Sequence, residues 1–139
     1  MATMHYTKAE DILDSEGMPD RDEAVDLSAF LGTWVNTNPL ARGIAKVILS
    51  APAGAFTVRV FGAGDPEPYD WQEVKGAVYT DGVGKHEATS FTALYDLGFM
   101  DVQLQTYLAK GVLVIASFAQ FKDGSGRANT FVKEFFYRQ

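Results

Sequence analysis

Residues 88–121 decide the fold, and they read ATSFTALYDLGFMDVQLQTYLAKGVLVIASFAQF. Apolar and polar side chains alternate through much of this stretch, which is the pattern of a β-strand with one buried face. In its middle, Val102 and Leu104 alternate with Gln103 and Gln105. Three successive strands are therefore predicted, over Ala88–Tyr95, Val102–Leu108 and Val112–Phe121.

Similar β-rich runs lie on both sides of this stretch and are separated by clusters of turn-forming residues. No segment between consecutive runs is long enough for a crossover helix, so neighbouring strands are expected to pair antiparallel. Eight consecutive antiparallel strands can close on themselves and remove their unpaired edges. The sequence predicts an all-β fold, an eight-stranded antiparallel up-and-down β-barrel. The five further strands are Thr33–Thr37, Ala45–Ser50, Phe56–Phe61, Trp71–Tyr79 and Asn129–Arg138.

The composition excludes several classes of function. The chain has 139 residues, no cysteine and a formal net charge of -6. The negative charge argues against a nucleic-acid partner, and the lack of cysteine excludes disulfides and thiolate chemistry. His5 and His86 are too far apart in sequence for a convincing zinc site, so no metal or cofactor is expected. No apolar run could span a bilayer and no secretory signal is recognisable, so no membrane partner is expected and the location is expected to be cytoplasmic.

The chain is expected to divide at residue 28. Residues 1–27 are polar and acidic, and they are predicted to be a loosely docked or flexible segment with a turn of helix near Lys8–Leu13. Asp26–Leu31 is expected to form a short helical turn capped by Asp26 or Ser28. Residues 28–139 are expected to form the barrel.

The last two strands break the alternation. Val112–Ala116 is apolar on both faces. In Asn129–Arg138, Phe131 and Phe135 lie on one face, and Val132, Glu134 and Phe136 lie on the other. The residue pattern leaves open which face lines the lumen. A wall that is apolar on both sides needs a cover outside, either a second subunit, which would make a homo-oligomer, or the N-terminal segment.

A short motif opens the first strand. Leu31-Gly32-Thr33-Trp34-Val35-Asn36 resembles the start of the calycin superfamily, which includes lipocalins, fatty-acid-binding proteins and avidins. The resemblance implies a ligand-binding barrel whose closed end is plugged by Trp34, with Arg138 packed across the indole as a structural partner. It also implies that Asn36 is a ligand hydrogen-bonding group.

The leading functional hypothesis is a barrel that holds a small apolar or amphipathic molecule in its lumen. Asn36 would be the polar anchor, and the loop at residues 61–70 is expected to cover the open end. The predicted walls of the pocket are Val58, Phe91, Tyr95, Leu104 and Phe136.

Two alternatives remain open. The same lumen could serve a cyclase or isomerase of secondary metabolism, with Glu134 as its catalytic acid or base. In a binding protein, Glu134 would instead form a salt bridge with a nearby lysine or arginine. A barrel filled by its own side chains would act only in assembly.

Overall fold

The computed structural model describes residues 25–139, and over these residues the protein is built from antiparallel strands. A single turn of 3-10 helix at Pro52–Gly54 follows β2. The predicted strand ends agree with the observed ones to within about two residues. The nine strands are β1 (Gly32–Asn36), β2 (Ile44–Ser50), β3 (Thr57–Gly62), β4 (Tyr69–Lys75), β5 (Ala77–Tyr79), β6 (Ser90–Asp96), β7 (Met100–Ala109), β8 (Val112–Phe121) and β9 (Thr130–Arg138).

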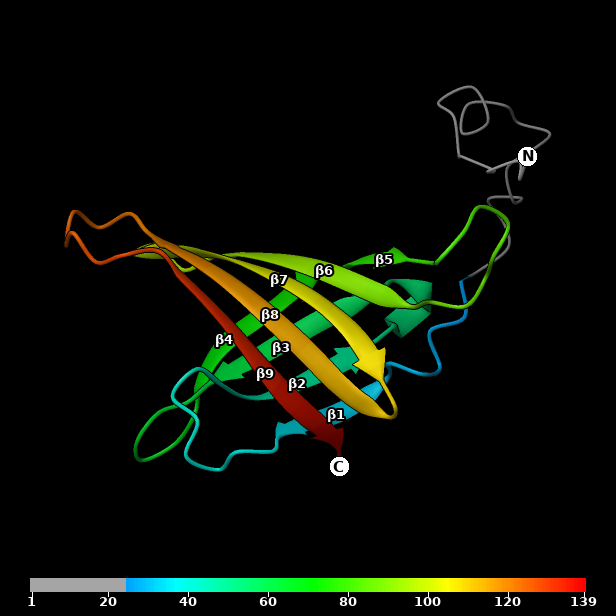
Figure 1. Ribbon diagram of the computed structural model, residues 1–139, viewed down its shortest axis with the longest axis horizontal. Coiled ribbons are helices and arrows are strands. Elements are labelled where there is room, and N and C mark those ends of the chain that lie inside the picture. The colour runs from blue at the N-terminus through cyan, green and yellow to red at the C-terminus, as the bar shows by residue number, and fades with distance from the viewer. Residues whose placement is uncertain (1–24) are drawn as a thin grey trace, which may run out of the picture.

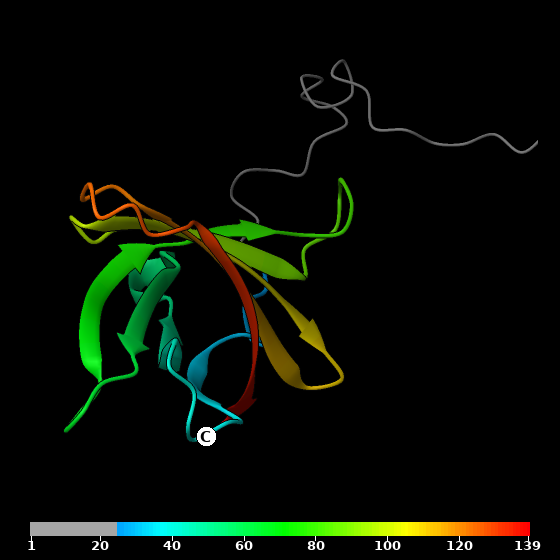
Figure 2. The same cartoon turned by 60° about the vertical axis from the view of Figure 1, so that its left-hand side comes forward.

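The strands form one strongly curled sheet in the order β4-β3-β2-β1-β9-β8-β7-β6-β5. β9 pairs with β1, with Arg138 opposite Trp34, and this pairing joins the last strand to the first. Figure 1 shows β7, β8 and β9 crossing in front of β2, β3 and β4, and the turned view of Figure 2 shows the sheet wrapping round. The result is a nearly closed barrel.

The prediction of eight strands is wrong by one, because Trp71–Tyr79 is two strands rather than one. Its first part, β4, pairs with β3, and its second part, β5, pairs with β6. Gly76 lies between them, where a Cβ atom would lie 2.6 Å from the Phe56 ring. Only glycine allows so close an approach, and here the chain passes from one edge of the sheet to the other.

Alternation along the strands separates the core from the surface. Val102, Leu104 and Thr106 of β7 are buried, whereas Gln103 and Gln105 are exposed. The structure also settles the facing of β9: Phe136 is 0% exposed and Phe131 is 59% exposed. Glu134 and Phe136 therefore lie on the inner face of the barrel.

The start of the described chain is attached to the barrel. Asp26 forms a bridge with Glu87, and its backbone N–H donates to the carbonyl of His86. The expected helical turn is a plain turn at Ser28–Phe30, in which the Asp26 carboxylate accepts the backbone N–H of Ser28 at 2.9 Å. The predictions for residues 1–24, including the helix near Lys8–Leu13, lie outside the described residues.

Candidate functional site

One end of the barrel is closed by aromatic side chains. Trp34 is 2% exposed, and its indole N–H donates to the carbonyl of Phe30 at 2.8 Å. The Arg138 guanidinium lies 4.7 Å from the centre of the Trp34 rings, in the arrangement that the motif implied. Phe91 meets both Phe30 and Phe56 edge to face. Trp34 is therefore packed on several sides by the residues at this end of the barrel.

The middle of the barrel is solid. Val58, Leu104 and Phe136 are 0% exposed, and Phe91 belongs to the same buried cluster. These four side chains are predicted from the sequence to be walls of a ligand pocket. They pack against one another instead, and none of them lines the cavity described below. We therefore do not include them in the candidate site.

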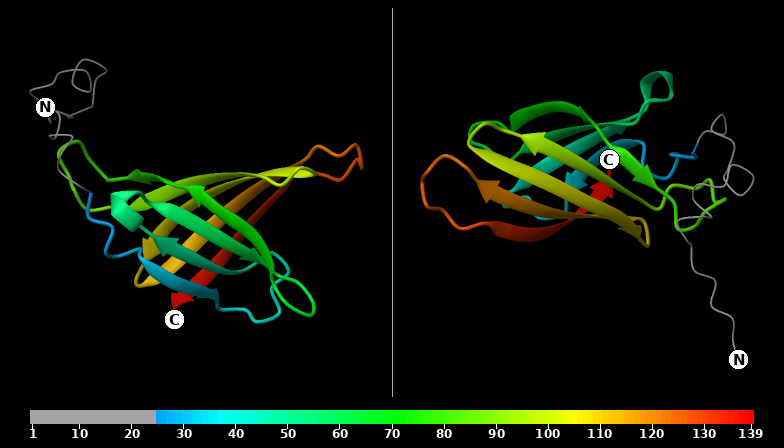
Figure 3. Two further views of the ribbon diagram at one scale, coloured as in Figure 1. Left: turned by 180° about the vertical axis from the view of Figure 1, so that it is seen from behind. Right: turned by 90° about the horizontal axis from the view of Figure 1, so that it is seen from above.

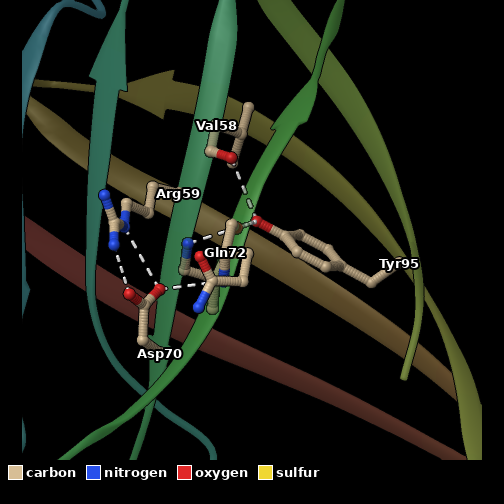
Figure 4. Close-up of polar contacts among 6 residues, drawn as sticks. Val58, Arg59, Asp70, Gln72 and Tyr95 are labelled. Carbon is tan, nitrogen blue, oxygen red and sulfur yellow. Dashed lines mark hydrogen bonds and ion pairs between the residues drawn. The ribbon is translucent and has the colours of Figure 1, made fainter. Parts of the chain in front are cut away.

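Tyr95 is also a structural residue rather than a wall of the cavity. Its hydroxyl crosses the interior from β6 to β3 and β4, where it accepts the Val60 N–H at 3.2 Å and contacts the carbonyls of Val58 and Gln72 at 3.0 and 2.8 Å. Figure 4 shows this arrangement. The phenol joins strands on the two sides of the gap in the barrel, because β4 and β6 are not paired with each other in the sheet order.

The Val60 N–H and the Gln72 carbonyl that the Tyr95 hydroxyl contacts lie at a β-bulge between β3 and β4. The register between β3 and β4 shifts between Arg59 and Phe61, and Gln72 opposite them has a φ of 73°. Asp70 stabilises this bend by accepting the Gln72 N–H at 2.8 Å and by pairing with Arg59. The hydrogen bonds from Arg59 hold the pKa of Asp70 below its usual value.

The opposite end of the barrel is open. There a cavity of about 310 Å³, here called the mouth cavity, lies between the first residues of β2, β4, β7 and β9 and the last residues of β3 and β8. In Figure 1 this is the left-hand end, where the loops after β1, β3, β6 and β8 gather. The predicted covering loop, 61–70, borders it through Ala63 and Tyr69. Its apolar lining comes from Trp71, Phe99, Met100, Val102, Phe121 and Val132.

Glu134 supplies a carboxylate to the wall of the mouth cavity. One carboxylate oxygen accepts the Asn36 side-chain N–H at 2.8 Å, and the other accepts the backbone N–H of Ile44 at 3.3 Å. Gly43 makes room for it, since a Cβ atom there would lie 2.5 Å from the carboxylate. Within residues 25–139 the salt bridge expected for Glu134 is not formed.

Asn36 orients this carboxylate and does not line the mouth cavity itself. It is buried, and its side-chain nitrogen also donates to the Ile44 carbonyl at 2.8 Å. Its oxygen accepts the Asn38 N–H at 2.8 Å. The amide of Asn36 is thus occupied by protein partners, and a contact between Asn36 and a ligand stays a prediction.

Comparison of the chain with protein-family models, curated proteins and solved structures finds no match. The function of the mouth cavity must therefore be inferred from its own geometry.

Several residues of the mouth cavity were not predicted from the sequence. Ser117 lines it and has a buried hydroxyl oxygen without a hydrogen-bond partner in the described part of the chain. Trp71 lies against Gly62, where a Cβ atom would be 2.6 Å from the indole nitrogen. Arg42, exposed in the loop before β2, borders the same space. One sequence feature could have indicated this cavity. Consecutive antiparallel strands bring alternate strand ends together at one end of a barrel, and most of these residues lie near those ends.

A second hollow lies beside the mouth cavity on the outside of the wall. It has a volume of about 550 Å³ and is bordered by Asn38, Pro39, Pro68 and Tyr137, and by Asn36, the predicted ligand hydrogen-bonding residue. No charged side chain lines it within the described residues. It therefore offers hydrogen-bonding side chains but no charge, whereas the mouth cavity combines a carboxylate with an apolar lining and is the better candidate site.

The outer face of β8 and β9 carries exposed aromatic side chains. Phe118 and Phe131 contact each other there, with ring centres 4.9 Å apart, and Phe135 and Tyr137 lie on the same side of β9. Figure 3 shows this hairpin extending beyond the barrel. That a second subunit covers the face remains a prediction.

Among residues 25–139, no helix is long and apolar enough to cross a membrane.

Proposed function

We propose that this protein binds a small amphipathic molecule in the mouth cavity. The observation that carries the proposal is an apolar hollow with one carboxylate in its wall. Small-molecule sites are typically concave and mostly apolar, with volumes of about 300–1,000 Å³ and a few polar groups that fix orientation. At about 310 Å³ the mouth cavity is at the lower end of that range, so the ligand is small.

We also propose that the barrel is calycin-like. Support comes from Gly32 and Trp34 at the start of β1, and from Arg138 packed over the indole at the closed end. The nine-stranded count and the gap between β4 and β6 are departures from a simple eight-stranded meander.

The alternative of a cyclase or isomerase rests on the same carboxylate. Glu134 could accept or donate a proton to a bound molecule. Its neighbour in the cavity wall is a serine, and the cavity has no histidine among its described lining residues. Binding therefore accounts for the site with fewer assumptions than catalysis does.

Filling the mouth cavity is expected to abolish binding. The neutral fluorescent probe N-phenyl-1-naphthylamine is suitable because its emission rises in an apolar environment. Ala119 lines the cavity, so Ala119→Phe places a ring where the probe would bind and is expected to weaken binding by at least about tenfold, or roughly 1.4 kcal/mol.

Gln120→Phe is the matched control for this titration. Gln120 is the next residue along β8 and is exposed on the outer face, so this variant adds the same ring outside the barrel. Its affinity for the probe should stay within about twofold of wild type. Equal loss of binding in both variants, or no loss in either, would place the probe somewhere other than the mouth cavity.

A further inference from the structure

Within the described residues, 25–139, the carboxylate of Glu134 has only neutral hydrogen-bond donors. The Asn36 amide and the Ile44 backbone N–H hold its two oxygens, and no cation among residues 25–139 lies within ion-pair distance. Removing a carboxylate from water is costly unless a charge or hydrogen bonds replace the lost hydration. A ligand that expels water from the mouth cavity must therefore supply a favourable partner for this group.

The hydroxyl of Ser117, beside Glu134, lacks a hydrogen-bond partner within the described residues. Ser117 lies opposite Val132, and Glu134 lies opposite Ile115, so Ser117 and Glu134 are diagonal neighbours on the inner face of β8 and β9. Such diagonal residues lie roughly 7–8 Å apart, which lets one small group between them contact both side chains. The Ser117 hydroxyl oxygen is buried and has no hydrogen-bond partner in the described chain.

A primary ammonium group matches both side chains. It carries three N–H donors and a positive charge, so it can donate to the carboxylate and to the serine oxygen together. A carboxylate ligand would instead meet the negative charge of Glu134. Arg42 at the rim is exposed, and an exposed cation contributes little to an ion pair. The charge of the inner wall therefore favours a cation.

Resting on the proposed binding function, we propose that the ligand is a small primary amine with an apolar tail. Its ammonium group lies between Glu134 and Ser117, and its tail packs against Trp71, Phe121 and Val132. n-Octylamine is a suitable probe.

Three ligands of equal chain length test the proposal on the wild-type protein. n-Octylamine, n-octanol and octanoate are each used at pH 7 to displace N-phenyl-1-naphthylamine. The amine is expected to bind about tenfold more tightly than the alcohol, because hydrogen bonds to charged groups are stronger than neutral ones. Octanoate is expected to bind more weakly than octanol. Equal binding of amine and alcohol, or tightest binding of octanoate, overturns the proposal.

Glu134→Gln tests which residue produces the preference. The ratio of octanol to octylamine dissociation constants is expected to fall from about ten to within about two in this variant. Glu73→Gln removes the same charge from an exposed position on β4 and should keep the wild-type ratio. An unchanged ratio in Glu134→Gln contradicts the proposal. If that variant does not fold, the comparison of the three ligands on wild type decides.

The experiments distinguish a failure of the proposed binding function from a failure of the proposed preference for a primary amine. If the fluorescent probe does not bind, or Ala119→Phe binds it as wild type does, the binding function is wrong. If the probe binds in the mouth cavity but octylamine binds no more tightly than octanol, only the proposal of an amine ligand is wrong.

Discussion

Replacing Trp34 with alanine is expected to lower the free energy of unfolding by about 3–5 kcal/mol, the usual range for truncating a fully buried aromatic side chain. The indole is 2% exposed at the closed end of the barrel. Its removal leaves a void, and it leaves the Phe30 carbonyl without the donor that it has at 2.8 Å. Arg138 also loses the ring over which it packs.

Urea denaturation followed by far-ultraviolet circular dichroism measures this loss. Trp71→Ala is the matched control, because Trp71 is only partly buried and borders the open mouth cavity. It is expected to cost less than half as much as Trp34→Ala. Equal losses in the two variants would mean that the two ends of the barrel are packed alike, contrary to the structure.

Tyr95→Phe is expected to destabilise the barrel by about 1–3 kcal/mol, the cost of leaving buried polar groups without partners. The phenylalanine keeps the ring and its edge-to-face contact with Trp71. It removes the hydroxyl that serves Val60 and Gln72 at the β-bulge. Because the lost contacts bridge β4 and β6, hydrogen exchange of the β4 amides should accelerate more than that of β8.

The same hydroxyl predicts a dependence on alkaline pH. Burial raises the pKa of Tyr95 to about 12, and the negative charges of Asp70 and Glu73 add to the rise. In the unfolded chain the pKa is about 10. The folded state therefore holds this proton more tightly, and its contribution to stability is complete below pH 10 and is lost as the pH rises toward 12.

The free energy of unfolding measured between pH 9 and 12 tests this dependence. Above pH 10 the wild-type protein should lose stability with a slope of up to about 1.4 kcal/mol per pH unit from this group. In Tyr95→Phe that part of the slope should be missing. Parallel curves for the two proteins would show that the Tyr95 hydroxyl ionises normally in the folded state.

The strands were predictable from local patterns. Alternation such as that of Val102 and Leu104 with Gln103 and Gln105 depends only on which face of a strand is buried. Turn-forming pairs such as Lys110-Gly111 mark where strands end. The position of Trp34 at the closed end was expected from its place in the motif at the start of β1.

The split at Gly76 and the role of Tyr95 were not predictable in this way. A strand that changes partners keeps the same alternation on both sides of the change, so Trp71–Tyr79 looks like one strand. The Tyr95 hydroxyl meets groups 23 to 37 residues away in sequence. Such contacts depend on the curvature of the sheet, which the residue pattern does not encode.

The candidate site was predicted only in part. Glu134 was a candidate for the lumen only in the enzyme alternative, and the structure places its carboxylate in the cavity wall. None of the predicted apolar walls lines the mouth cavity, because a long inward side chain such as Phe136 can either fill a barrel or line a hollow. Whether such a side chain fills the barrel or lines a hollow depends on the volume that facing strands leave between them. The residue pattern does not give that volume, so Ser117 and Trp71 were identified as cavity residues only from the structure.

The most direct test of the central claim is a ¹H–¹⁵N correlation spectrum recorded during titration with N-phenyl-1-naphthylamine. Binding in the mouth cavity predicts that the largest amide shift changes fall on Gly62, Val102, Ser117 and Val132, which surround that space. Shift changes centred instead on Leu94, Phe118 and Phe131 of the outer face, or the absence of saturable changes, would contradict the account.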